Sequence, residues 1–227
     1  MSARDVWVVI PAYNEEETLA NVLEAFSEEN YSLLVIDDGS DDHTSNIALA
    51  YPVVLLRHMI NLGQGAALKT GFDYLINQTN AKYVVTFDSD GQHNVNEIHQ
   101  LIKPLMSQNY DVVLGSRFLT GRNGNNIPLS KLITLKLGVL FTRMTTKLKV
   151  TDTHNGLRGF TIEALKRIQI SQNGMAHASE IISEIAKKEL RWKEVQVTIE
   201  YTPYSKKKGQ SIFNSVNILW DLFFGRD

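Results

Sequence analysis

Short apolar runs alternate with longer amphipathic segments along the first half of the chain. Runs rich in β-branched residues predict strands, and apolar residues at helical spacing predict helices between them. The predicted strands cover Val6–Ile10, Ser32–Ile36, Val53–Leu56, Tyr83–Phe87 and Val112–Leu114, and the predicted helices cover Glu15–Ser27, Thr44–Ala50, Gly65–Ile76 and Asn94–Met106. This alternation predicts an α/β fold whose mainly parallel sheet carries helices on both faces.

Polar clusters follow four of the five predicted strands. They read PAYNE after the first strand, DDGSD after the second, DSDGQH after the fourth and GSR after the fifth. Each cluster taken alone is equally typical of a turn or a helix cap. Because the carboxyl ends of parallel strands meet at one edge of a sheet, the set together predicts a ligand site there.

The fourth cluster carries two carboxylates one residue apart, Asp88 and Asp90. Such a pair at a strand end can share a hard divalent cation, Mg²⁺ or Mn²⁺, which usually bridges protein carboxylates to substrate phosphates. A cation there would stabilise the negative charge of a departing diphosphate. An exposed acidic turn is the alternative interpretation.

Composition narrows these possibilities. A chain of 227 residues suits one compact domain, and the absence of cysteine excludes disulfides and thiolate metal sites. The amino terminus has neither a signal peptide nor a spanning segment, so we expect a cytoplasmic protein. The formal net charge is −2, yet the stretch from Val112 to Thr151 holds seven basic residues and no acid. It lacks a nucleic-acid recognition motif, so we expect no nucleic-acid partner.

Five motifs occur in an order that points to a known family. The segments VVIPAYNEEETL, VIDDGSDDHT, GQGAALKTGF, VVTFDSDGQH and LGSRF resemble those of family 2 inverting glycosyltransferases with the GT-A fold, and most of all the polyprenyl-phosphate sugar transferases. Dolichyl-phosphate mannose synthase and bacterial undecaprenyl-phosphate enzymes typify that group. The resemblance implies a Rossmann-like GT-A domain over residues 1–210. It also implies metal-dependent transfer of a sugar to polyprenyl (undecaprenyl) phosphate for cell-surface glycan synthesis, with N-acetylglucosamine or glucose from a UDP-sugar favoured over a GDP-sugar.

The resemblance also implies roles for individual residues. Residues implied to bind the nucleotide are Pro11, Tyr13, Glu15, Ile36, Asp38, Lys69, Asp88 and Ser89, although Lys69 reads equally as a solvated lysine. Those implied to hold Mg²⁺ or Mn²⁺ are Asp88, Asp90 and Gln92. Those implied to bind phosphate or the acceptor are Arg117, Lys131, Lys136, Arg143, Lys206 and Lys208. The segment YSKKKGQS departs from the family pattern R-x-x-G-x-S-K, which leaves the phosphate contact open among its three lysines.

The need for a general base depends on the acceptor. A lipid phosphate is already ionised near neutral pH, whereas a saccharide hydroxyl requires a residue that takes its proton. Candidates for that residue are Asp152, His154 and Glu180, of which Asp152 could equally cap a turn and Glu180 could be a surface acid. We therefore carry Asp90, Arg117, Asp152 and Glu180 as candidate catalytic residues. A transferase to a saccharide hydroxyl and a non-catalytic nucleotide-sugar-binding protein are the alternative functions.

Two segments predict attachment to a membrane. The basic stretch is interleaved with apolar residues, as in an amphipathic helix that lies on an anionic bilayer. Residues 211–227 also carry apolar residues at helical spacing, and about 13 residues are too few to span a bilayer. We expect this segment to dock on a membrane or on a partner, with packing into the core as the alternative. The protein would then be peripheral at the inner face of the cell membrane, with a separate small membrane protein as a further anchor.

Overall fold

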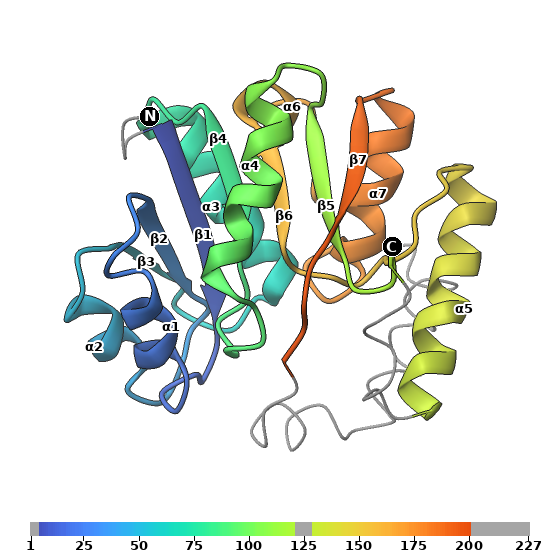
Figure 1. Cartoon of the computed structure of the whole chain (residues 1–227). Coiled ribbons are helices and arrows are strands. Elements are labelled where there is room, and N and C mark those ends of the chain that lie inside the picture. Colours follow the sequence, from blue (N-terminus) through green and yellow to red (C-terminus); the bar gives the residue numbers. More distant parts are fainter. Residues whose placement is uncertain (1–4, 121–128, 201–227) are drawn as a thin grey trace.

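The structure is a computed structural model that describes residues 5–120 and 129–200. A seven-stranded sheet forms its centre, with strand order β3-β2-β1-β4-β6-β5-β7 (Figure 1). The strands are β1 (Val6–Ala12), β2 (Ser32–Asp37), β3 (Val54–Arg57), β4 (Tyr83–Thr86), β5 (Val112–Ser116), β6 (Arg158–Thr161) and β7 (Trp192–Gln196). All pairings are parallel except those of β6, which runs antiparallel to both β4 and β5.

Helices connect the strands in the predicted alternation. The helical elements are α1 (Leu19–Ala25), α2 (Thr44–Leu49), α3 (Gln64–Gln78), a 3₁₀ turn η2 (Val95–Glu97), α4 (Ile98–Met106), α5 (Leu129–Thr146), α6 (Ile162–Leu165) and α7 (His177–Lys187). The helix that we predicted from Asn94 therefore begins as a 3₁₀ turn, which the Asn94 side chain caps by accepting from the Asn96 N–H. The α/β fold with a mainly parallel sheet is confirmed.

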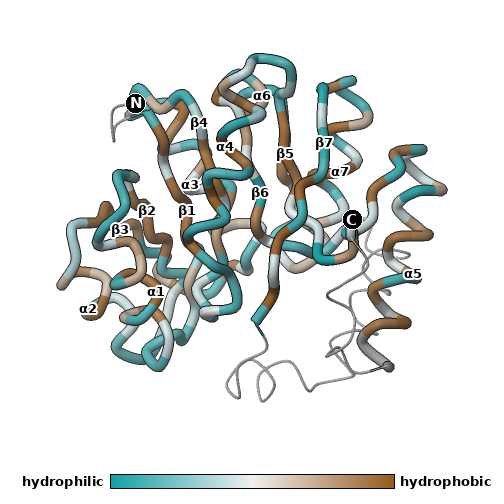
Figure 2. The backbone as a smooth tube through the Cα atoms, in the orientation of Figure 1, coloured by the Kyte–Doolittle hydropathy of each residue, from teal (hydrophilic) through white to brown (hydrophobic). Residues whose placement is uncertain are grey.

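Two apolar layers hold the helices on the sheet. Because side chains alternate along a strand, Val8 and Ile10 of β1 face one layer, with α1, α2 and α4, while Val9 faces the other, with α3, α6 and α7. Strand residues are accordingly hydrophobic along the centre of the sheet (Figure 2). Helix α5 stands apart from both layers, at the side of the molecule near α7 (Figure 1).

The strand order also decides where the loops meet. The carboxyl ends of β1, β2, β4, β5 and β7 lie at the same edge of the sheet, and the antiparallel β6 begins there. The loop before β6, residues 153–157, is thereby brought to this edge between the ends of β4 and β5. Within the described ranges, no helix is both long enough and apolar enough to cross a membrane.

Candidate functional site

Hydrogen bonds between loops fix the edge of the sheet near β1. The Ser89 hydroxyl, after β4, donates to the carbonyl oxygen of Pro11 at 2.8 Å. The Asn14 N–H donates to the Ser40 hydroxyl at 2.9 Å, and the Asp38 N–H donates to the Ala12 carbonyl oxygen at 2.8 Å. Three of the polar clusters predicted from the sequence are therefore brought together.

Asp88 lies at the centre of this edge. Its Oδ1 accepts from the Gln64 amide at 3.1 Å, its Oδ2 lies 3.1 Å from His93 Nε2, and its carboxylate packs against the Cα of Gly156. Burial acts to raise the pKa of Asp88, but the hydrogen bond with His93 and the positive charge of Arg158 outweigh it and hold that pKa below its ordinary value. Asp88 is therefore an ionised carboxylate at neutral pH.

Asp90 follows on the same loop, where Gly91 adopts a left-handed conformation with φ 72° that favours glycine. Burial and the adjacent charge of Asp88 raise the pKa of Asp90 to about 6. Two carboxylates that disfavour each other's charge in this way suit a shared divalent cation, which would relieve the repulsion. The two carboxylates would supply some of the oxygen ligands of such a cation, which commonly takes the others from phosphate and water. The described residues contain no cluster of three or more His, Asp or Glu side chains arranged for a metal.

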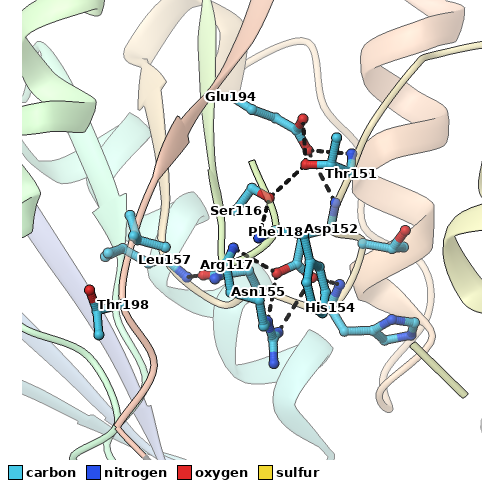
Figure 3. Close-up of polar contacts among 12 residues, drawn as sticks. Ser116, Arg117, Phe118, Thr151, Asp152, His154, Asn155, Leu157, Glu194 and Thr198 are labelled. Carbon is cyan, nitrogen blue, oxygen red and sulfur yellow. Dashed lines mark hydrogen bonds and ion pairs between the residues drawn. The ribbon is translucent and has the colours of Figure 1, made fainter. Parts of the chain in front are cut away.

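Arg117 and Asp152 form a buried ion pair at the end of β5. The guanidinium donates from Nε to Asp152 Oδ2 at 2.6 Å and from Nη2 to Oδ1 at 3.4 Å, and the side chains are 7% and 1% exposed (Figure 3). The Arg117 and His154 N–H groups also donate to this carboxylate, at 3.2 and 3.3 Å. The oxygens of Asp152 thus accept hydrogen bonds from four protein N–H groups, and its candidate role as a catalytic base stays a prediction.

The Glu180 carboxylate binds the loop that precedes α7. Its carboxylate accepts from the backbone N–H groups of Ser171 and Gln172, at 3.0–3.1 Å, and from the Ser171 hydroxyl. It therefore fixes the loop before α7, whose Asn173 carbonyl accepts the N–H of Gly65 at the start of α3. Glu180 supports this loop, and its candidate catalytic role stays a prediction.

Three residues that sequence reasoning missed complete the site. Arg158 of β6 is 4% exposed and donates from Nε to the Asn155 carbonyl at 2.9 Å and from Nη2 to the Thr153 carbonyl at 2.8 Å. Its Nη1 and the Asn155 Nδ2 are buried without a hydrogen-bond partner among the described residues. Burial lowers the pKa of Arg158 to about 10, so it stays charged, and it lowers the pKa of His177 to about 4, so that imidazole is neutral.

The predicted nucleotide-binding residues divide into two groups. Tyr13 is 39% exposed at this edge, and Glu15 is buried with its Oε2 accepting from the Thr18 hydroxyl at 2.9 Å. The side chain of Ile36, by contrast, is fully buried in the layer beneath α3, and the place of Ile36 in the base-binding loop stays a prediction. Lys69 pairs with Asp73 one helical turn away, at 2.7 Å on the exposed side of α3.

Asp38 is engaged by the protein on both carboxylate oxygens. Oδ1 lies 2.7 Å from His58 Nδ1 and accepts the Leu62 N–H at 3.0 Å. Oδ2 accepts the Gly63 N–H at 2.7 Å and the Asn61 amide at 3.0 Å. The sequence predicts that Asp38 receives a base N–H, whereas these contacts give it a firm role in anchoring the glycine loop to the end of β2.

The remaining predicted residues lie around α5 or outside the described chain. Lys136 is exposed on α5, and Arg143 donates from Nε to the Val150 carbonyl at 2.7 Å. Lys131 belongs to α5, but its side chain is not among those described. Lys206, Lys208 and the predicted docking segment 211–227 lie outside the described residues.

Comparison with known proteins places the chain among glycosyltransferases. An uncharacterised protein of Methanocaldococcus jannaschii is 36% identical over 96% of this chain and 90% of its own length. The UDP-N-acetylglucosamine–dolichyl-phosphate N-acetylglucosaminyltransferase of Methanococcus voltae is 31% identical over 98% and 96%. Dolichol-phosphate mannosyltransferase of Pyrococcus furiosus is 28% identical over 96% of this chain and 63% of its own.

A solved structure shares the fold. Glucosyl-3-phosphoglycerate synthase from Mycobacterium tuberculosis, in complex with Mn²⁺, uridine diphosphate and phosphoglyceric acid, superimposes with a TM-score of 0.68 at 18% identity, covering 96% of this chain and 78% of that one. Residues 7–169 match the profile described as glycosyl transferase family 2. The predicted resemblance is thus confirmed: the chain belongs to glycosyl transferase family 2 and is an enzyme that uses nucleotide sugars.

Proposed function

We propose that the protein transfers a sugar from a nucleotide donor to a polyprenyl phosphate, with inversion at the anomeric carbon. One observation carries this proposal. The carboxylate pair after β4 and the Arg117–Asp152 pair after β5 lie at one edge of the sheet, separated by β6. The first pair suits the diphosphate of a donor through a cation, and the second presents a guanidinium suited to the phosphate of an acceptor.

The reaction follows from the charges of the two substrates. An ionised phosphate oxygen of the acceptor attacks the anomeric carbon while the bond from that carbon to the nucleoside diphosphate breaks, so the lipid gains the sugar and the nucleotide leaves as its diphosphate. No proton has to be removed, which agrees with the engagement of Asp152 and Glu180 in other contacts. Asp88 and Asp90, with Gln92 nearby, would hold Mg²⁺ or Mn²⁺, and that cation would neutralise charge on the departing diphosphate. Arg117 would hold the acceptor phosphate in line.

The donor that we propose is a UDP-sugar carrying N-acetylglucosamine or glucose. The support is the relative from Methanococcus voltae, which is named for transfer of N-acetylglucosamine from its UDP-sugar to dolichyl phosphate and matches almost the whole of this chain. The names of this relative and of the Pyrococcus furiosus relative both give dolichyl phosphate, a polyprenyl phosphate, as the acceptor. We propose cell-surface glycan synthesis as the pathway that uses the product.

Helix α5 supports a membrane-bound acceptor. Its inner face buries Leu135, Gly138 and Thr142, and Gly138 lies against the His154 ring. Its outer face exposes a stripe of large apolar side chains at helical spacing, 49–73% exposed, made of Ile133, Leu137, Leu140 and Met144. The exposed Lys136 lies among them, and the exposed Lys147 follows directly after the helix. We propose that this stripe rests on an anionic bilayer at the inner face of the cell membrane, with the segment 211–227 as a second contact.

The test is a reaction with defined substrates. Purified protein, Mn²⁺ and undecaprenyl phosphate are incubated with UDP-N-acetylglucosamine, UDP-glucose or GDP-mannose, and lipids are identified by mass spectrometry. We expect a sugar phospholipid from one UDP-sugar and none from an Asp90→Ala variant that folds normally. A product only when a saccharide replaces the lipid would favour the hydroxyl-acceptor alternative. No product from any donor, even with membranes added, would count against the proposal.

A further inference from the structure

The ion pair of Arg117 is itself held by a second acid, Glu194 of β7. Glu194 Oε1 accepts the N–H of Thr151 at 2.7 Å and the N–H of Asp152 at 3.2 Å, and Oε2 accepts the Thr151 hydroxyl at 2.9 Å (Figure 3). All three donors belong to the two residues that deliver the Asp152 carboxylate to Arg117. Glu194 therefore fixes the backbone from which that carboxylate projects.

The register of β7 on β5 explains why Glu194 reaches this turn. Leu114 pairs with Glu194 and Ser116 pairs with Gln196, so the two β7 side chains project on the same side of the sheet. The Ser116 and Thr151 hydroxyls lie 2.6 Å apart. Gln196 accepts the Thr120 N–H at 2.9 Å and donates to the Arg117 carbonyl at 3.4 Å. Both the arginine and its aspartate are thus tied to one strand.

This arrangement is electrostatically unfavourable for Glu194. Burial raises the pKa of Glu194, and the neighbouring charge of Asp152 raises it as well, while the hydrogen bonds from Thr151 and Asp152 oppose the rise. Two carboxylates in adjacent positions repel each other, and an anchor for two N–H groups does not require a charged residue. The Glu194 carboxylate is nevertheless present here, where it orders the turn at Thr151 and Asp152 that carries the ion-pair partner of Arg117.

We propose that Glu194 is a positioning residue for the acceptor phosphate. It holds the turn at Thr151 and Asp152, and through Asp152 it sets the direction in which the Arg117 guanidinium points. The inference rests on the proposed function, in which Arg117 binds the phosphate of a polyprenyl phosphate. Glu194 does not touch either substrate, and its effect is confined to the acceptor side.

The test compares Glu194→Ala with Glu194→Gln in the full chain, using UDP-sugar, Mn²⁺ and undecaprenyl phosphate. We expect Glu194→Ala to raise the KM for undecaprenyl phosphate about tenfold, as the loss of a hydrogen bond to a charged group does, while kcat and the KM for the donor change less than about twofold. Glu194→Gln should restore the acceptor KM, because its amide oxygen can still accept the two N–H groups and the Thr151 hydroxyl can turn to accept its amide N–H.

The matched control loosens the same strand at its other end. Asp111 accepts from the Arg191 N–H, Nε and Nη2 at 2.6–3.0 Å, where β5 and β7 begin. Asp111→Asn should leave the acceptor KM unchanged, whatever it does to the melting temperature. An equal rise in that variant, an unchanged acceptor KM in Glu194→Ala, or a Gln variant as defective as the Ala variant would overturn the inference. If Arg117→Ala also leaves the acceptor KM unchanged, the proposed role of Arg117 fails instead.

Discussion

Gly156 is the residue against which the Asp88 carboxylate rests. A Cβ added at Gly156 would lie 2.0 Å from Asp88 Oδ2 and 2.5 Å from its Cγ, so the carboxylate would have to move. We expect Gly156→Ala to lower kcat by roughly tenfold to a hundredfold, because displacements of about 1 Å have effects of this size. The rate is measured at saturating substrates and over a range of Mn²⁺ concentrations.

Gly174→Ala is the control for this substitution, because a Cβ there has nothing within 4 Å. It should leave the rate unchanged and the melting temperature close to that of the wild type. A Gly156→Ala enzyme with full activity would mean that the position of Asp88 does not matter for turnover.

His177 makes the free energy of unfolding depend on pH. Burial and the charge of Arg158 lower its pKa from 6.5 to about 4, against the opposing hydrogen bond to the Gly174 carbonyl. Between these values the unfolded chain binds a proton that the folded chain does not, so stability falls as pH falls from about 6.5 to 4. When the pH falls from 7 to 4.5, the free energy of unfolding of His177→Asn should fall by roughly 2–3 kcal/mol less than that of the wild type.

Urea unfolding of both proteins at a series of pH values measures this difference. Asn is suited to the comparison because its amide can donate to Gly174 in place of the imidazole. Parallel curves for the two proteins would show that His177 has the same pKa in the folded and the unfolded chain, contrary to the expectation.

At the scale of elements, α5 exposes four large apolar side chains along one face, Ile133, Leu137, Leu140 and Met144. The helix buries Leu135, Gly138 and Thr142, whereas it exposes Leu137 and Leu140. We expect the double change Leu137→Glu and Leu140→Glu to weaken binding to anionic phospholipid vesicles at least about tenfold, because two apolar side chains lose their lipid contact and two negative charges are added. Stability should hardly change, because both leucines are already exposed.

Leu49 offers a control for the vesicle measurement. It is 70% exposed on α2, on the opposite side of the molecule from α5 (Figure 1). Leu49→Glu should bind vesicles as the wild type does in sedimentation with vesicles. Equal losses in both variants would indicate a general effect of charge, and no loss in the α5 variant would remove α5 as the membrane contact.

The elements also show how far sequence patterns reach. The five predicted strands are present, and each carries an apolar run that is visible in the sequence, although that of β3 is only partly buried. β6 and β7 were missed. β6, with sequence RGFT, is short and begins with a buried arginine, and every residue of β7 is partly exposed, so neither carries an apolar run. The polar clusters at the strand ends could be predicted because each directly follows an apolar run in the sequence. Arg117 pairs with Asp152, and Glu194 of β7 supports that pair. These contacts join segments that are far apart in the chain, so no local sequence pattern predicts them.

At the scale of the whole molecule, the order of the strands divides the sheet into two halves. β3, β2, β1 and β4 carry the loops predicted to hold the nucleotide, while β5 and β7 carry Arg117 and the residues that fix it. The antiparallel β6 joins the halves, with Arg158 paired between Thr86 and Leu114. A donor bound to the first half should therefore leave the ion pair of the second intact, which makes donor and acceptor binding separable by mutation.

Nucleotide binding to the first half should stabilise the entire fold, because that half includes the centre of the sheet. A ligand at 100 times its Kd adds about 2.7 kcal/mol, which corresponds to roughly 5–10 °C in melting temperature for a chain of this length. We expect that shift in melting temperature from UDP with Mn²⁺, a smaller shift from UDP with EDTA, and the smallest of the three from GDP with Mn²⁺. Asp90→Asn should remove the part that depends on Mn²⁺, since it removes one carboxylate of the pair, while Arg117→Ala should keep it. Equal shifts in the presence of Mn²⁺ and of EDTA would mean that the carboxylates after β4 do not join the nucleotide to a cation, and an equal shift from GDP would argue against a uridine donor.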